Sequence, residues 1–159
     1  MFVRRFSLPV IASIATATAA ATAVVGLAVP LPAMAVSSVL LTGIQYDPPG
    51  KDTRTNAHLN QEYVTVRNSS TKAISLAGWR IRDAQNHTFV FPRGYVLKAR
   101  TTATIRTGKG KNTATTLYWN QGNYIWNNTG DTARFQNPAN RVIDTCSYKA
   151  VKNRARVAC

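Results

Sequence analysis

The segment Gly78-Trp79-Arg80-Ile81-Arg82-Asp83 decides the fold class of this chain. Successive side chains of a β-strand point to opposite faces of its sheet. Trp79 and Ile81 therefore point to one face, and Arg80 and Arg82 point to the other. The alternation predicts a strand with one face on a hydrophobic core and one face in solvent.

The segments 63–67 and 102–106 show the same alternation of apolar and polar residues. The residues expected in the core are Val64, Val66, Ala103 and Ile105, and those expected in solvent are Tyr63, Thr65, Arg67, Thr102, Thr104 and Arg106. No window after residue 36 has a helical period, whereas short runs rich in Val, Ile, Thr, Tyr, Phe and Trp recur between turn residues. The expected strands are 38–46, 61–68, 73–76, 79–83, 88–91, 101–107, 115–119, 132–136 and 141–148. Many short strands predict an all-β sandwich or barrel.

A long polar segment, 47–60, interrupts this pattern. It contains two prolines and has no apolar period. We expect a loop here, and long loops often carry binding sites. Glu62, just after the loop, shares the parity of Val64 and Val66. We therefore expect Glu62 to be partly buried and to need a partner, either a backbone amide or an arginine.

The first 35 residues predict an export signal. Arg4 and Arg5 precede a stretch rich in Ala, Val and Leu, and Ala33 and Ala35 form a small-x-small cleavage site. We expect cleavage before Val36, a single domain over 36–159 and no membrane span afterwards. The alternative is a retained anchor, since the stretch approaches the ~20 residues that span a bilayer. The arginines match a twin-arginine signal only in part, so the export route stays open.

Composition places the mature chain among folded, strongly basic, single-domain proteins. Hydrophobic residues make up 45% of the chain, with three Trp, six Tyr and five Phe, which is enough for a core. Lys and Arg number 20 against 6 Asp and Glu. Removal of Arg4 and Arg5 with the signal leaves 18 against 6, a formal charge of +12. These numbers exclude multidomain enzymes and proteins with acidic tails.

Cys146 and Cys159 are the only cysteines. An even count in a chain bound for an oxidising compartment predicts a disulfide. By closing a short loop it would contribute about 3 kcal/mol, and it would hold the basic C-terminal tail. Two free thiols or an intermolecular bridge are the alternatives. Zinc is not expected, because no His lies near the two cysteines.

Four motifs follow one another along the chain: IQYDPPGKD at 44–52, NQEYVTVRN at 60–68, ISLAGWRIRD at 74–83 and WNNTGDTA at 126–133. In this order they resemble the lamin-tail domain family, from about Val39 to Tyr148. The resemblance implies an immunoglobulin-like β-sandwich. It also implies a tethering or adhesion role, since bacterial members occur in exported proteins, alone or joined to hydrolases and nucleases. Thr65 stands where many members have a second acidic residue, so a family charge pair is not expected on that strand.

The residues give little support for catalysis. There is no G-x-S-x-G elbow, no H-E-x-x-H motif and no phosphate-binding glycine loop. His58 and His87 are expected on the surface, and neither belongs to a nucleophile-base pair. We expect no enzymatic activity, no cofactor and no metal. The rival hypothesis is a small secreted hydrolase or nuclease that uses Glu62, Asp52 and His58.

A possible calcium site and a cluster of aromatic residues each have two interpretations. Side chains with oxygen atoms lie on and beside the long loop, namely Asp47, Asp52, Asn56, Asn60 and Glu62. Such side chains are suitable calcium ligands, but they also form ordinary turns. Four rings either pack in the core or, if exposed and coplanar, stack on sugars or bases; they are Tyr118, Trp119, Tyr124 and Trp126. We favour turns and core packing.

The positive charge is the most informative functional feature. The candidate polyanion-binding residues are two strand arginines, five cations within 14 residues on a predicted hairpin, and the tail: Arg80, Arg82, Lys98, Arg100, Arg106, Lys109, Lys111, Lys149, Lys152, Arg154 and Arg156. Such a surface attracts polyanions, nucleic acid included, without specificity. The alternative is that the charge only keeps the protein soluble.

We therefore expect a secreted or extracytoplasmic protein, with the cell surface as one location. Its expected function is that of a non-catalytic binding module for an acidic polymer or envelope protein. A purely structural envelope protein is the third hypothesis, beside the small hydrolase or nuclease.

Overall fold

The computed structural model describes residues 37–159. The predicted export signal at 1–35 and its cleavage site lie outside the described residues. Within them the chain forms eleven strands and one short helix. The strands are β1 (Val39–Gln45), β2 (Tyr63–Asn68), β3 (Ile74–Ser75), β4 (Arg80–Arg82), β5 (Thr88–Val90), β6 (Val96–Leu97), β7 (Thr102–Arg106), β8 (Thr116–Tyr118), β9 (Gly130–Gln136), β10 (Val142–Lys149) and β11 (Arg156–Ala158), and the helix is α1 (Asn56–Leu59).

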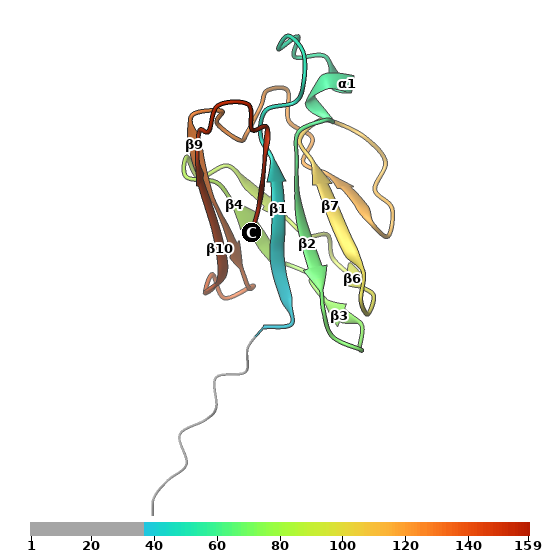
Figure 1. The fold of residues 1–159 in the computed structure, drawn as a ribbon. Coiled ribbons are helices and arrows are strands. Elements are labelled where there is room, and N and C mark those ends of the chain that lie inside the picture. Colours follow the sequence, from blue (N-terminus) through green and yellow to red (C-terminus); the bar gives the residue numbers. More distant parts are fainter. Residues whose placement is uncertain (1–36) are drawn as a thin grey trace, which may run out of the picture. The chain divides into compact units, whose positions relative to one another are not determined.

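The strands form two layers (Figure 1). The five-stranded sheet has the order β11-β1-β2-β7-β8, the four-stranded sheet has the order β10-β9-β4-β5, and β3 pairs with β6. This arrangement confirms the all-β prediction and selects a sandwich. The hairpin predicted across 98–111 is wrong, because β7 and β8 are parallel. Parallel neighbours need a connection that returns along the sheet, and residues 107–115 form it.

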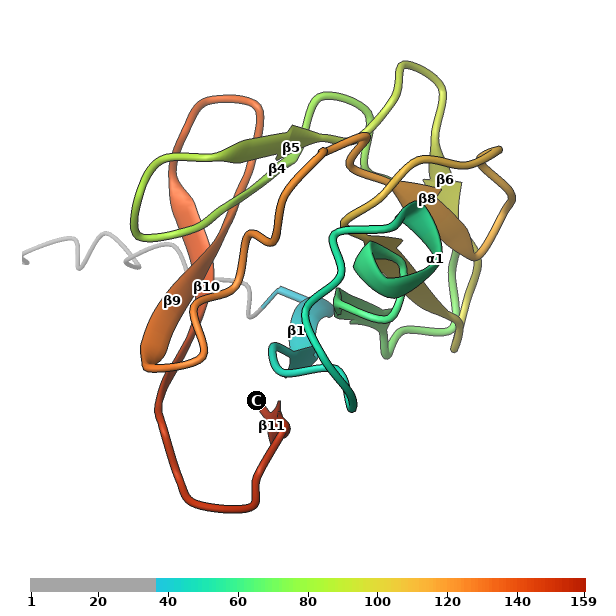
Figure 2. The ribbon, with the colours of Figure 1, turned by 90° about the horizontal axis from the view of Figure 1, so that it is seen from above.

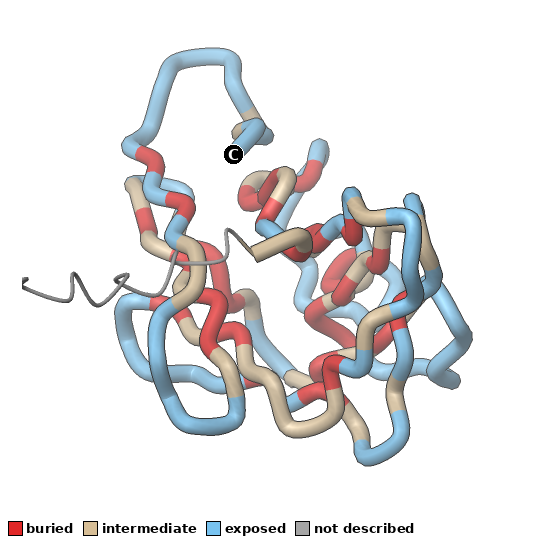
Figure 3. Tube along the Cα trace, turned by 90° about the horizontal axis from the view of Figure 1, so that it is seen from below, coloured by how far each residue is buried: buried red, intermediate tan, exposed pale blue. Residues whose placement is uncertain are grey.

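Side-chain alternation predicted the inward residues correctly. Its placement of Thr65 in solvent is wrong, because Thr65 is 7% exposed and its hydroxyl packs against β1, where it bonds the Thr42 hydroxyl and the Gly43 carbonyl. The inward residues of β2, β4 and β7 are fully buried, namely Val64, Val66, Ile81, Ala103 and Ile105. Figure 3 shows buried positions along the strands and exposed positions along the loops and the tail. Trp79 is half-buried and packs against this core, with its ring 4.9 Å from that of Phe135. Burial of such side chains stabilises the fold by about 1.5–3 kcal/mol each.

The segment predicted as a long loop contains α1. The Thr55 hydroxyl caps the helix by accepting a hydrogen bond from the His58 N–H. The side-chain amides of Asn56 and Asn60 both donate to the Lys109 carbonyl at 3.0 Å. A helix of four residues is not stable alone. These tertiary contacts hold α1, which explains why sequence periodicity missed it.

The C-terminal tail joins the two layers. After β10 the chain crosses to the edge of the five-stranded sheet, where β11 pairs with β1 (Figure 2). Cys146 in β10 and Cys159 after β11 form the predicted disulfide. Asp144 makes a second link across this seam between β1 and β10, since its carboxylate accepts a hydrogen bond from the Leu41 N–H at 2.8 Å. β11 was not predicted, because the tail sequence shows little alternation of polar and apolar residues.

Replacement of both Cys146 and Cys159 by Ser should lower the free energy of unfolding by about 3 kcal/mol. The disulfide limits the conformations of the unfolded chain, and its loss restores that entropy. Thermal denaturation should show a Tm lower by roughly 10 °C. The unmutated protein in reducing agent should behave like the double variant. An unchanged Tm would mean that β11 and Asp144 hold the seam without the disulfide.

Candidate anion-binding surface

Glu62 lies directly before β2, and its side chain is fully buried. Its carboxylate accepts hydrogen bonds from the N–H groups of Ile125 at 3.0 Å and Trp126 at 2.9 Å, and from the Thr107 hydroxyl. Backbone amides therefore provide the predicted partner. Burial raises the pKa of Glu62 to about 7, although these hydrogen bonds act in the opposite direction. The contact fastens the segment before β9 to the five-stranded sheet.

Three more carboxylates bind backbone N–H groups inside the protein. Asp83 is fully buried and accepts hydrogen bonds from the N–H and the ring Nδ1 of His87 at 2.7 and 2.6 Å. Asp131 is 5% exposed and accepts from the N–H groups of Ala84, Asn127 and Thr132. Asp144 accepts from Leu41 and Thr145. Of the six carboxylate side chains, only Asp52 is exposed.

The basic side chains lie nearer the surface, and several of them donate to backbone carbonyls, among them Arg80, Arg106 and Arg134. None of the 18 Lys and Arg residues between 37 and 159 is buried. Apart from Arg141, none of these 18 lies within ion-pair distance of a carboxylate. Three of the six carboxylates are buried, whereas every cation between 37 and 159 is at least partly exposed, so positive charge dominates the surface of the described residues.

The structure distributes the predicted cations over three regions. Arg80 and Arg82 lie in β4, next to Arg134 of β9, which sequence analysis did not single out although it alternates with Ala133 and Phe135. The five cations of the predicted hairpin lie at opposite ends of β7. Lys98 and Arg100 precede the strand. Arg106 is its last residue, and Lys109 and Lys111 follow it. The tail region consists of Lys149, Lys152, Arg154 and Arg156 on β10, β11 and the loop between them.

A row of side chains crosses the outer face of the five-stranded sheet, from the tail to β8. Paired residues along the row are, in order, Arg156, Gln45, Tyr63, Arg106 and Tyr118. The Arg106 guanidinium lies 5.9 Å from the centre of the Tyr63 ring and donates to the Asn60 carbonyl. No strand of this sheet contains Asp or Glu. The row therefore holds fixed cations beside aromatic rings on an uncompensated surface.

Close contacts also hold Arg156 of this row, and Arg67 outside it, on the same outer face. The Arg156 guanidinium lies over Gly43, where a Cβ would be 3.3 Å from its Nη2. Glycine thus makes room for Arg156 on the sheet. Arg67, which strand parity had placed in solvent but which was not a predicted site residue, donates to the Thr102 hydroxyl at 3.3 Å.

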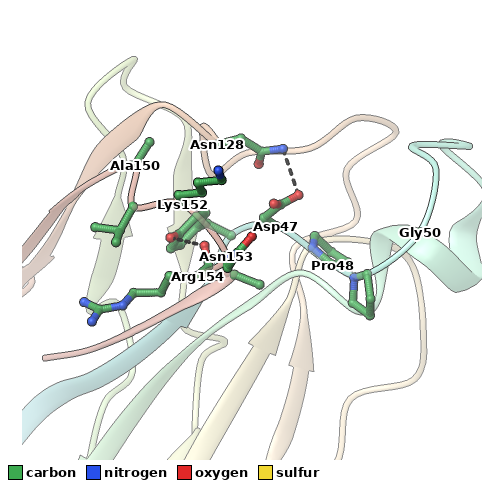
Figure 4. Close-up of a pocket in the computed structure, with 12 residues that line it drawn as sticks. Asp47, Pro48, Gly50, Asn128, Ala150, Lys152, Asn153 and Arg154 are labelled. Carbon is green, nitrogen blue, oxygen red and sulfur yellow. Dashed lines mark hydrogen bonds between the residues drawn. The ribbon is translucent and has the colours of Figure 1, made fainter.

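The tail and the long loop enclose a pocket of about 500 Å³, which we call the tail pocket. Residues 46–50 form one side, residues 150–155 form the other, and Asn128 completes the lining. The Ala155 carbonyl accepts hydrogen bonds from the N–H groups of Tyr46 and Asp47, so the tail is fixed against the loop. In Figure 4, Asp47 lies between the tail residues and Pro48 and binds the Asn128 amide at 3.0 Å. Lys152 and Arg154 give this pocket a net positive charge.

Residues 32–150 match the model of the Lamin Tail Domain. The chain belongs to the lamin tail domain family. Its domains are immunoglobulin-like, non-enzymatic interaction domains, which agrees with the sandwich and confirms the resemblance of the four motifs. Residues 151–159, with β11 and Cys159, lie outside the match and extend the domain. Comparison with curated proteins gave no match.

Two of the three residues of the rival enzyme hypothesis, Glu62 and His58, bind other groups in this lamin tail domain, and the third, Asp52, is exposed. His58 is 8% exposed, so its predicted surface position is wrong. Its Nε2 lies 3.3 Å from the Pro49 carbonyl and its Nδ1 bonds the Tyr124 hydroxyl. Because a carbonyl only accepts, Nε2 is the donor. His87 is exposed as predicted and bonds Asp83. Within residues 37–159, no hydrogen bond joins any two of Glu62, Asp52 and His58.

The proposed calcium ligands also have separate partners. Asp47 binds Asn128, Glu62 binds the 125–126 backbone, and both Asn56 and Asn60 bind Lys109. Residues 37–159 contain no cluster of three or more His, Cys, Asp and Glu side chains that could hold a metal. Hydrogen bonds within the protein thus engage Asp47, Glu62 and Asn56 and the amide nitrogen of Asn60, whereas Asp52 is exposed.

The aromatic cluster is mainly core. Trp119 and Trp126 are 6% and 1% exposed, and their rings meet edge to face at 5.9 Å. Tyr118 and Tyr124 are half-buried. The favoured interpretation, core packing, therefore holds for both tryptophans, and none of the four rings is fully exposed, as a platform of two or three of them would require. Tyr118 reaches the outer row described above.

Stability should decrease as pH rises from about 4.5 to about 7. The pKa of Glu62 in the folded protein is about 7 against an ordinary 4.5, so in this window the native state holds a proton that the unfolded chain releases. The contribution is complete below pH 4.5 and is lost as pH rises through 7. It amounts to about 3 kcal/mol. Urea denaturation across this pH range measures it.

Glu62→Gln should flatten that pH profile, since Gln does not titrate. Asp52→Asn removes the exposed carboxylate and should leave the profile as it is. Retention of the original slope in Glu62→Gln would assign the pH dependence to another group.

Proposed function

We propose that this lamin tail domain is an exported, non-catalytic module that attaches to an anionic polymer or an acidic envelope component. The observation that carries the proposal is the segregation of charge. Backbone N–H groups hold the buried carboxylates, and the cations that the proposal uses, in the tail and on the five-stranded sheet, lie beyond ion-pair distance of any carboxylate among residues 37–159. A polyanion would supply counterions for them and release its own condensed ions, which favours binding at low salt.

The tail and the adjoining outer face of the five-stranded sheet form the binding surface in this proposal. Lys152 and Arg154 at the tail pocket lead into Arg156, which begins the row across the sheet. Arg106 and Arg67 continue the positive surface over the neighbouring strands. Such cations contact the charged phosphate groups of a nucleic acid rather than its bases, so nucleic acid is expected to bind without sequence specificity.

An extracytoplasmic location is part of the proposal. The expected export signal and the Cys146–Cys159 disulfide support it, because such bonds persist in oxidising compartments. Among residues 37–159, no helix has the length and apolar character needed to cross a bilayer. The rival structural role in the envelope differs in one measurable respect, since it requires no salt-sensitive attachment to a polyanion.

A triple variant, Lys152→Gln, Arg154→Gln and Arg156→Gln, should elute from heparin and DNA columns at clearly lower salt than the unmutated protein. If each side chain contacts one phosphate or sulfate, the slope of log K against log salt should fall by about 3. Column elution and binding titrations at several salt concentrations measure both effects.

The matched control is Lys51→Gln, Lys72→Gln and Arg93→Gln, which removes the same charge from exposed positions outside the tail and the row. It should keep most of the binding. Equal losses in both variants would mean that net charge alone causes retention, and no retention of the unmutated protein at low salt would exclude the proposed function.

A further inference from the structure

A second pocket lies at the opposite seam of the sandwich, between the edge strands β5 and β8. Its volume is about 250 Å³, below the roughly 300–1,000 Å³ of pockets for drug-sized ligands. The lining includes Thr88, Asn112, Tyr118, Trp119, Asn120 and Gln121. We call it the neutral pocket, because no charged residue belongs to its lining.

The lack of charge is unusual on this protein. Cations are present on both sheets and throughout the tail, yet none lines this pocket. A charged ligand here would find no counterion in the lining and would lose hydration. The neutral pocket therefore suits an uncharged polar ligand.

The polar groups of the lining offer both donors and acceptors. Asn112 uses its Oδ1 to accept from the Tyr118 N–H at 3.0 Å, which leaves its amide N–H groups as donors. Thr88 donates its hydroxyl to the Asn86 carbonyl, which leaves oxygen lone pairs as acceptors. Asn120 has a left-handed backbone, φ 62°, and its exposed side chain can both donate and accept. Vicinal hydroxyl groups need this mixture, because each hydroxyl donates and accepts.

The aromatic groups favour a sugar ring over a nucleobase. A base needs an open ring face on which to stack. Here the rings of Phe89 and Trp119 are only 5.8 Å apart and inclined at 56°, and the Gly110 backbone lies against the Tyr118 ring, where a Cβ would be 2.3 Å from Cζ. A pyranose can be held without such a face, because its hydroxyl groups can bind the amide side chains of the lining.

Trp119 supplies one further observation. It is 6% exposed and lines the neutral pocket, and its indole N–H has no hydrogen-bond partner. Buried donors are normally satisfied. The indole nitrogen itself is covered by protein atoms, so it offers no direct contact to a ligand, but the residue that carries it lines the pocket and its N–H signal can report on occupancy of the site.

We propose that the neutral pocket binds one pyranose unit of an uncharged glycan. This site is separate from the polyanion surface, and neither proposal depends on the other. The purified protein is titrated by NMR with cellotriose, maltotriose, mannotriose and the trimer of N-acetylglucosamine. At least one of these should bind with a Kd of about 1 mM or below, with shifts at the Trp119 indole N–H and at Asn120 and Gln121.

Asn120→Ala and Gln121→Ala should each weaken that binding about fivefold to tenfold, the effect of one lost hydrogen bond. Asn153→Ala is the matched control, because Asn153 is also exposed with a left-handed backbone, φ 64°, but lines the tail pocket. It should bind the saccharide as the unmutated protein does. The tail variant described above should also bind normally, and added salt should have little effect, which distinguishes this site from the polyanion surface.

Three results would overturn the proposal. One is the absence of binding by all four saccharides at millimolar concentration. Another is a saccharide affinity that stays the same in Asn120→Ala and in Gln121→Ala but falls in Asn153→Ala. The third is that uncharged nucleosides or an extended peptide, and none of the saccharides, produce the shifts at Trp119.

Discussion

Hydrogen bonds from the backbone to buried carboxylates are the constraint on which this structure depends. Glu62 holds the segment at 125–126, Asp131 joins the turns at 84 and 127, and Asp144 links the two sheets at Leu41. The bonds to residues 84, 125, 126 and 127 satisfy N–H groups in irregular segments, and the bond from Leu41 satisfies an N–H of β1 beyond the stretch that pairs with β11. The same bonds occupy carboxylates that could otherwise pair with cations, so the interactions that close the fold also shape its charged surface.

The two edges at which the sheets of the sandwich meet differ in the charge of their residues. At the seam between β1 and β10, a disulfide and β11 bring a basic tail, beyond the family match, against the loop at 46–50. At the seam between β5 and β8, amides and aromatic rings surround a pocket without charge. One protein of modest size thus presents two surfaces of opposite chemistry, and the lamin tail domain fold supports both at the edges of its sheets.

Sequence reasoning succeeded where the signal is local. Strand parity gave the core positions of β2, β4 and β7 and the burial of Glu62, because a side chain's face follows directly from its place in a strand. It failed where partners are distant in the chain. The parallel pairing of β7 with β8, the burial of His58 against Tyr124 and Pro49, and the helix held by Lys109 all depend on contacts that no local pattern encodes.

The amino-acid sequence determined the all-β class, the family, the two cysteines available for a bond and the excess of positive charge, since these follow from periodicity, motif order and composition. Only the tertiary structure decided that the acidic side chains turn inward, that Arg156, Tyr63 and Arg106 align across strands, and that the pocket beside Trp119 excludes charge. The physical reason is that hydrogen-bond partners and surface neighbours are set by the pairing of strands far apart in the chain, whereas alternation and composition are properties of the chain itself.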